Sequence, residues 1–145
     1  MKPLVHGASA LMALALLAAP QGESAAQDVV AVVSAKSPVT SLSAAQLADI
    51  FLGKTARFPD GTPAVPIDLA DDSPMRERFY ARYTGKSPAQ LKAHWAKIIF
   101  TGRGQPPRQV AGSAEAKKAV ADDPQAIGYL DSRLVDSQLR VLSPQ

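Results

Sequence analysis

The residues best suited to bind a ligand lie in one stretch, residues 67–80, IDLADDSPMRERFY. A Ser-Pro pair commonly begins a helix, and the first N–H groups of a helix have no partner within it and carry partial positive charge. Ser73 and the N–H groups of Met75 and Arg76 therefore have the chemistry to bind a tetrahedral oxyanion. The Arg76 side chain is the nearest counter-charge.

The same stretch has a second explanation that needs no ligand. Ser73 can accept hydrogen bonds from the amides of its own helix, as N-cap serines do. Asp71 and Asp72 would then complement the helix dipole. Residue chemistry alone favours this capping explanation over an anion site.

Other site chemistries find little support in the sequence. After residue 26 the chain has one histidine, His94, and no cysteine, so we expect no metal site and no cofactor. No G-x-S-x-G motif is present, and the prominent serines stand at helix starts, where capping explains them. We therefore expect no catalytic residues and no enzymatic activity.

Residues 101–108, TGRGQPPR, have a basic, glycine- and proline-rich composition. The segment lacks the G-K-[S/T] ending of a phosphate loop, and its two prolines remove amide donors. We interpret it as an exposed connector in which Arg103 and Arg108 face a partner or an anion.

The elements around these residues alternate between strand and helix, which predicts an α/β domain with a small mixed sheet flanked by helices. Strands are expected at 29–33, 64–69, 126–130 and 138–142. Pro66 lacks a backbone donor, so the second of these strands is expected at an edge of the sheet.

Four helices are predicted from serine start signals. The expected N-caps are Ser43, Ser73, Ser87 and Ser113. Glycines are expected to end the first two helices. The third helix is expected to present one apolar face made of four residues: Leu91, Trp95, Ile98 and Ile99.

The N-terminal segment predicts export. Lys2 precedes an apolar run at 10–19 that is too short to span a bilayer, and Ser24-Ala25-Ala26 forms a small-residue cleavage site. We interpret 1–26 as a cleaved signal peptide and 27–145 as a single domain in a bacterial periplasm, not inserted in the membrane. The net charge of +3 suits anionic ligands and is too weak to indicate nucleic acid.

Several segments together resemble the phosphate-type substrate-binding proteins of ABC transporters. The resemblance rests on LSAAQLADIFLGKTARFPDGTPAVPI at 42–67, on the helix SAEAKKAVADDP and on AIGYL at 126–130. It implies one lobe of a type 2 periplasmic-binding-protein-like fold, with phosphate gripped at the segment matching 69–79. There Ser73 keeps the family's serine and Asp71 its acidic residue.

The chain also departs from the family. Leu69 stands where the resemblance implies an arginine, and Pro74 and Met75 replace a glycine and a threonine. The residues suffice for one lobe, whereas the family closes two lobes on its ligand, so a second lobe would come from a homodimer or a partner.

Two hypotheses follow. The first is an accessory to phosphate or related oxyanion uptake that works with an ABC permease. The second is an interaction module in envelope sensing or assembly that kept the fold and lost the ligand, with a sensor protein as its partner.

Overall fold

The computed structural model describes residue 3 and residues 28–144. Apart from residue 3, the segment interpreted as a signal peptide lies outside the described residues, as does the expected cleavage point before Gln27. No helix in the described part of the chain is both long enough and apolar enough to cross a bilayer.

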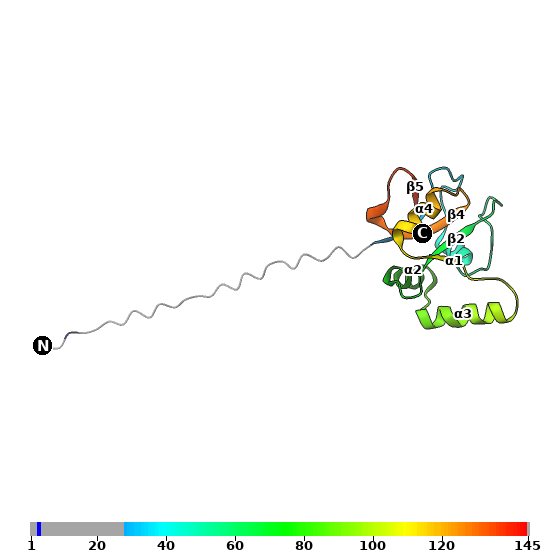
Figure 1. The fold of residues 1–145 in the computed structure, drawn as a ribbon, viewed down its shortest axis with the longest axis horizontal. Helices are drawn as coiled ribbons and strands as arrows, with labels where there is room; N and C mark the ends of the chain where they lie inside the picture. The colour runs from blue at the N-terminus through cyan, green and yellow to red at the C-terminus, as the bar shows by residue number, and fades with distance from the viewer. Residues whose placement is uncertain (1–2, 4–27, 145) are drawn as a thin grey trace.

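One mixed sheet organises the domain, as the alternating sequence predicted (Figure 1). The strands are β1 (Val29–Ser34), β2 (Val65–Leu69), β3 (Arg108–Val110), β4 (Ala126–Asp131) and β5 (Leu139–Leu142). They lie in the order β3-β2-β4-β1-β5; β2 runs parallel to β3 and β4, and β1 runs antiparallel to β4 and β5.

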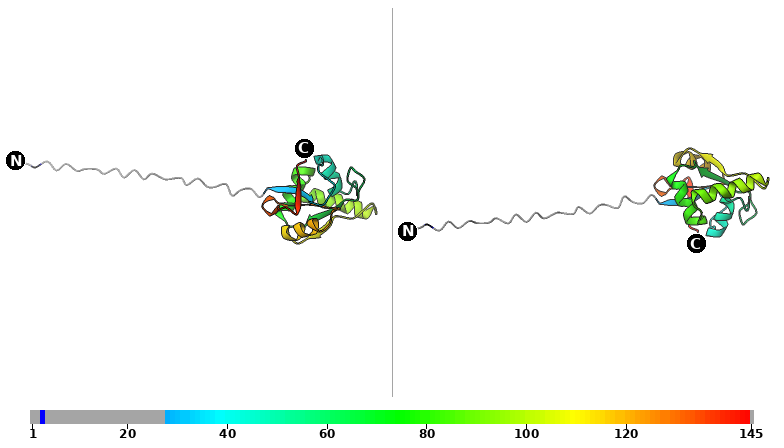
Figure 2. Two further views of the ribbon diagram at one scale, coloured as in Figure 1. Left: turned by 90° about the horizontal axis from the view of Figure 1, so that it is seen from above. Right: turned by 90° about the horizontal axis from the view of Figure 1, so that it is seen from below.

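Helices cover both faces of this sheet (Figure 2). They are α1 (Ala44–Phe51), α2 (Pro74–Thr84), α3 (Pro88–Phe100) and α4 (Ser113–Ala121), with a short 3-10 helix, η1 (Ser132–Leu134), after β4. Two neighbouring residues of β4 show the two faces: Tyr129 stacks on Phe79 of α2 with ring centroids 3.9 Å apart, whereas a Cβ added at Gly128 would meet Val120 of α4. The side of the sheet that α1 and α2 cover is thus an aromatic core.

The predicted helix starts are correct at three of four positions. Ser43 and Ser87 form reciprocal capping boxes with Gln46 and Gln90, and Ser73 accepts a hydrogen bond from its own helix. The fourth assignment is wrong by one residue, because Ser113 is the first residue of α4 and Gly112 is its N-cap. A glycine there leaves α4 without a side-chain cap.

Strand β2 is not at an edge, because β3 pairs with its outer side. The N–H of Val65 points toward the β4 side, where it donates to the carbonyl of Gln125, the residue before β4, so the nitrogen of Pro66 faces the side of β3. Strand β3 pairs only with Ile67–Leu69, so the missing donor of Pro66 falls outside that ladder. The three residues of β3 were not predicted at all, because they are too short for a periodic pattern.

The apolar face predicted for α3 is only partly buried. Of the four predicted residues, Leu91 and Trp95 lie in the core and Ile98 is half-buried, but Ile99 is 56% exposed. Phe100, which follows that face, is 92% exposed. Figure 1 shows why: α3 runs along one side of the domain, and the sheet lies beyond α1 and α2. The end of α3 therefore leaves apolar surface uncovered.

Candidate functional site

The carboxyl ends of the three parallel strands lie at one edge of the sheet, where α2 and α4 begin. Ligands of open α/β sheets bind at such an edge. A hollow of about 570 Å³ opens there, and we call it the strand-end hollow. The residues that matter for its chemistry are Ser73, Met75, Gly112, Ser113, Asp131 and Arg133.

The start of α2 contributes little free donor capacity to this hollow. The Ser73 hydroxyl accepts the N–H of Arg76 at 3.3 Å, and the Ser73 carbonyl accepts the N–H of Glu77 at 3.2 Å. Pro74 has no N–H. Met75 is the second residue of α2, and the N–H at this position has no partner within a helix. Among the described residues at this helix start, the Met75 N–H is therefore the backbone donor that lacks an acceptor.

The start of α4 is the better anion cradle. Gly112 is in extended conformation and brings no capping side chain, so the first N–H groups of α4 are not satisfied by its N-cap. The Glu115 carboxylate lies close by, since a Cβ built on Gly112 would stand 3.3 Å from its Oε2 atom. An incoming anion must compete with this acidic side chain for the positive end of the helix.

Arg133 brings a cation into the strand-end hollow, whereas Leu69 stands where the family resemblance implies an arginine. It follows β4 and lies in the same hollow as Ser73 and Met75. Its Nε atom donates to both oxygens of Asp131 at 3.0 Å and its Nη2 atom to Oδ2 at 2.5 Å. These hydrogen bonds, together with one from the Arg133 backbone, lower the pKa of Asp131. The Nη1 atom has no partner among residues 28–144 and remains available to an anion.

The four residues predicted to bind a ligand are divided between two places. Ser73 and Met75 line the strand-end hollow, with Met75 largely buried. Asp71 and Arg76 instead line a separate hollow beneath α3. Arg76 is therefore not the counter-charge of the strand-end hollow.

Arg76 belongs to a buried network with Asp68. Its Nε atom lies 3.2 Å from Asp68 Oδ2 and its Nη1 atom 3.6 Å from Asp71 Oδ1. Burial opposes the charged form of Arg76, but the charge of Asp68, the hydrogen bond to it and the nearby Tyr80 and Tyr129 together outweigh burial and raise the pKa of Arg76. Through its ion pair with Asp68, the Arg76 side chain links α2 to β2.

Arg103 and Arg108, the residues predicted to meet a partner, are both exposed and do not line the strand-end hollow. Arg108 opens β3 and lines a surface hollow beside α4. Arg103 lies in the turn that follows α3.

Metal binding finds no support within the described residues, where no group of three or more His, Asp or Glu side chains comes together. The ring of His94 lies 2.8 Å from the Leu52 carbonyl, a contact between α3 and the end of α1.

Sequence reasoning missed Gly112, Ser113 and Arg133 as residues of the strand-end hollow. A signal was present, because residues 131–133 directly follow a predicted strand. If that strand is placed parallel to the one at 64–69, their carboxyl ends share an edge, and Arg133 comes near Ser73. The parallel pairing of β2 with β4 is what the sequence pattern alone did not specify.

Comparisons with known proteins agree on the fold. The structure is similar to a putative phosphate ABC transporter substrate-binding protein with bound phosphate from Clostridium perfringens, at a TM-score of 0.63 and 22% identity, over 80% of this chain and 44% of that one. It is also similar to an ABC-type phosphate transport receptor from Vibrio cholerae, with a TM-score of 0.60 and 19% identity, over 79% of this chain and 45% of that one. For a possible phosphate binding protein from Planctomyces limnophilus the TM-score is 0.58 and the identity 15%, over 80% of this chain and 41% of that one.

No model of a known protein family matches the chain, and no curated protein does either. The chain spans less than half the length of each of these solved structures. The likeness therefore establishes the fold: a mixed α/β lobe of the kind found in phosphate ABC transporter substrate-binding proteins.

Proposed function

We propose that this protein is a non-enzymatic, exported oxyanion-binding lobe that serves phosphate or related oxyanion uptake beside an ABC permease. Residues 1–26 act as its signal peptide, and residues 27–145 act as one domain in the periplasm. Reversible binding takes place in the strand-end hollow.

The observation that carries this proposal is the convergence of two helix starts and one arginine on the same hollow. The N–H groups of Met75 and of the first turn of α4 offer hydrogen bonds, and Arg133 offers a charged donor. Backbone donors at helix starts together with a guanidinium suit a tetrahedral anion. The Clostridium perfringens protein, which has a similar fold, was solved with phosphate bound.

The same hollow sets an upper limit on affinity. It is open, the Arg133 side chain is 65% exposed, and Glu115 lies beside the start of α4. We expect a Kd for phosphate on the order of 1 mM, equivalent to about −4 kcal/mol. A second wall, from another copy of this chain or a partner lobe, would tighten binding by excluding water.

Calorimetric titration of the purified protein with inorganic phosphate tests the proposal. Arg133→Gln is expected to weaken binding about tenfold, or about 1.4 kcal/mol, because a charged donor is lost. Arg103→Gln is the matched control, an exposed arginine outside the hollow, and should leave the affinity unchanged. Absence of any heat at tens of millimolar phosphate with folded protein, or an equal loss in both variants, would remove phosphate binding as the function.

A role as an interaction module is the second candidate, and one observation favours it. Phe100 is 92% exposed at the end of α3, and the basic segment 101–108 follows directly. Affinity capture from envelope extract, comparing wild type with a Phe100→Ser and Arg103→Ala double variant, tests it. One identified partner that binds only the wild type would support docking through this surface, and equal capture by both proteins would count against it.

A further inference from the structure

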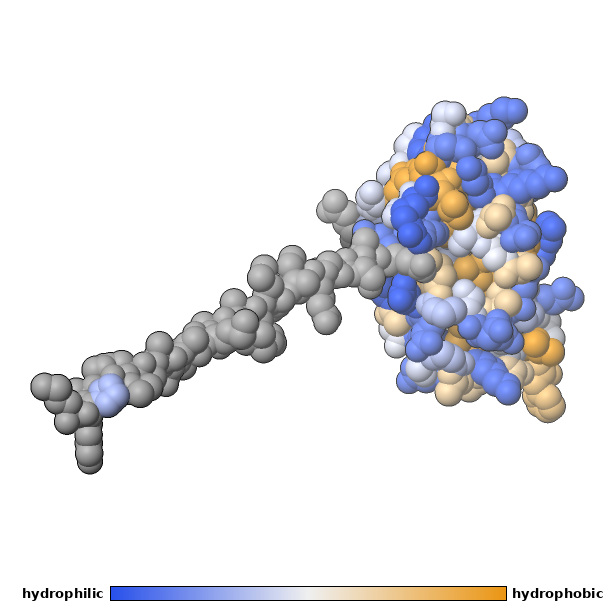
Figure 3. Space-filling view, turned by 60° about the vertical axis from the view of Figure 1, so that its left-hand side comes forward, coloured by the Kyte–Doolittle hydropathy of each residue, from blue (hydrophilic) through white to orange (hydrophobic). Residues whose placement is uncertain are grey.

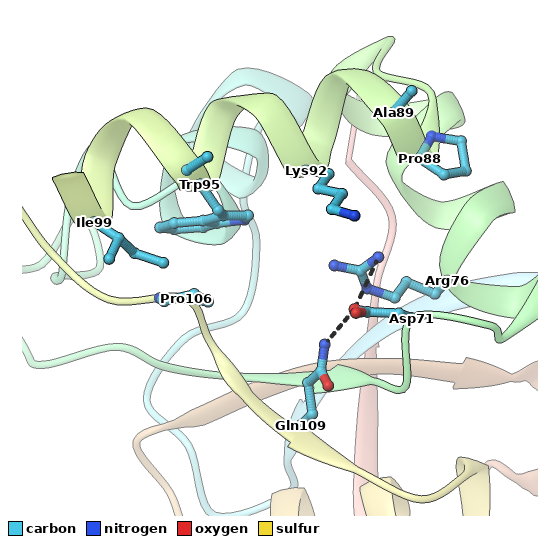
Figure 4. A pocket seen from close by; sticks show the side chains of 10 residues that line it. Asp71, Arg76, Pro88, Ala89, Lys92, Trp95, Ile99, Pro106 and Gln109 are labelled. Atoms are coloured by element: carbon cyan, nitrogen blue, oxygen red, sulfur yellow. Dashed lines mark hydrogen bonds and ion pairs between the residues drawn. The ribbon is translucent and has the colours of Figure 1, made fainter.

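A second hollow, beneath α3, has the size of a ligand site. We call it the α3 hollow; its volume is about 570 Å³, and known small-molecule pockets span roughly 300–1,000 Å³. It lies between α3, the segment that leads into β3, and the start of α2 (Figure 4). It shares no lining residue with the strand-end hollow.

One end of the α3 hollow is apolar. Figure 4 shows the indole ring of Trp95 with Ile99 and Pro106 beside it. Ile99 is one of the few large apolar side chains that stay mostly exposed in the described part of the chain, at 56%. A planar or branched apolar group placed there would cover surface that the fold leaves in contact with water.

The other end carries hydrogen-bond donors that lack acceptors. The Trp95 indole nitrogen is buried and has no acceptor among residues 28–144, which leaves its loss of hydration uncompensated. Figure 4 shows this nitrogen at the end of the ring that faces Lys92. The Lys92 ammonium points toward Arg76 and has no partner within the described residues either.

The carboxylate that lines this hollow, Asp71, is already engaged. Asp71 accepts the side-chain amide of Gln109 at 2.7 Å and faces the Arg76 guanidinium at 3.6 Å. Arg76 is paired with Asp68 as well. Asp71 is thus the only carboxylate among the lining residues, it is engaged elsewhere, and an oxygen that carries negative charge would give the Lys92 ammonium and the Trp95 N–H the partner that they lack.

We propose that the α3 hollow binds a small amphipathic anion, in which one carboxylate or sulfonate group is joined to an apolar body. The anionic oxygens meet the Lys92 ammonium and the Trp95 N–H, and the apolar body lies between Ile99 and Pro106. Because the indole nitrogen is shielded from solvent, an oxygen reaches it only with a small shift of neighbouring side chains. Inorganic phosphate lacks the apolar body, so this site is distinct from the oxyanion site.

Trp95 is the only tryptophan in the chain, so its fluorescence reports on this hollow directly. The probe is 8-anilinonaphthalene-1-sulfonate, an aromatic sulfonate, and its neutral counterpart is N-phenyl-1-naphthylamine. The sulfonate is expected to bind saturably and to quench Trp95 by energy transfer, and inorganic phosphate should not compete.

Charge and apolar contact are then separated by variants. Lys92→Gln should weaken binding of the sulfonate about tenfold and leave binding of the neutral probe unchanged, since only a charged contact is lost. Lys97→Gln, an exposed lysine of the same helix that does not line the hollow, is the matched control. Ile99→Ser should weaken both probes.

Four results would overturn the proposal. They are no saturable quenching of Trp95, equal sulfonate affinity in Lys92→Gln and wild type, competition by inorganic phosphate, and sulfonate binding that appears only as the circular dichroism of the fold is lost. The last control matters because this sulfonate also binds loosely packed states.

Discussion

At the scale of single residues, the Asp68 carboxylate is the polar centre of the fold. It is 1% exposed, and four donors reach it: Arg76 Nε at 3.2 Å, the Tyr80 hydroxyl at 2.8 Å, the Tyr129 hydroxyl, and the N–H of Leu69 at 2.9 Å. These donors come from β2, α2 and β4. A buried carboxylate is tolerated when charge and hydrogen bonds are both satisfied, as they are here.

Asp68→Asn should therefore be strongly destabilising. It leaves the Arg76 guanidinium buried without its main partner, which typically costs about 3–5 kcal/mol. Urea unfolding at neutral pH measures this loss. Asp72→Asn, at an exposed carboxylate near the start of the same helix, should change the free energy of unfolding by less than about 0.5 kcal/mol. A small effect at Asp68 would mean that the network contributes little to the fold.

Tyr80 and Tyr129 make the stability depend on pH on the alkaline side. Burial, followed by the charge of Asp68 and the hydrogen bond to it, raises the pKa of both phenols far above their usual value. Unfolded tyrosines lose their protons near pH 10, while the folded protein keeps them, so the free energy of unfolding falls as pH rises above about 10.

Urea unfolding at pH 9 and pH 11, in wild type and in Tyr80→Phe, checks this expectation. The variant has one raised phenol fewer, so its loss of stability between the two pH values should be smaller. An identical loss in both proteins, or phenolate absorbance from all three tyrosines while the fold is intact, would contradict the account.

At the scale of elements, α3 packs against the end of α1. Gly53, just after α1, has φ +74°, and a Cβ there would come within 2.8 Å of the Trp95 ring. The His94 ring contacts the Leu52 carbonyl beside it. The end of α1 is thus the surface on which α3 docks.

Gly53→Ala should destabilise the protein more than Gly61→Ala. Both positions have positive φ, but nothing lies within 4 Å of a Cβ at Gly61, so only backbone strain is added there. Overlap with Trp95 should cost a further 1–3 kcal/mol or so and shift the Trp95 emission to longer wavelength as α3 loosens. Equal effects at the two glycines would show that α3 does not depend on this contact.

The helix starts were the most predictable elements, because Ser43, Ser73 and Ser87 act through bonds to residues three positions away. Local chemistry determines such features. One local prediction, the N-cap at Ser113, was wrong by one residue. The other wrong or missing predictions depended on tertiary placement: Pro66 in an inner strand, the three residues of β3, and the exposure of Ile99.

The candidate site follows the same division. Ser73 and Met75 were predicted as ligand-binding residues because they share a helix start. Asp71 and Arg76 were assigned to the same site because they are close to Ser73 in the sequence. The structure separates them, since α2 turns the Arg76 side chain toward Asp68 and away from the strand ends. Arg133 lies 60 positions beyond Ser73 in the chain, and only the pairing of β4 with β2 brings it near.

At the scale of the whole molecule, we propose that the described domain presents one wall of a binding site. Its surface is mostly hydrophilic on the face seen in Figure 3, with hydrophobic residues in small separate patches. Because the strand-end hollow opens to solvent, we expect an anion bound there to exchange freely and tight binding to need a second surface over it. We therefore propose that phosphate meets the starts of α2 and α4, next to Arg133.

The most direct test of that claim is a titration of ¹⁵N-labelled protein with inorganic phosphate, followed by amide chemical shifts. We expect concentration-dependent, saturable shifts at Met75, at Gly112–Ala114 and at Arg133, with little change along α3. Shifts that are absent at tens of millimolar phosphate, or that gather around Lys92 and Trp95 instead, would contradict it.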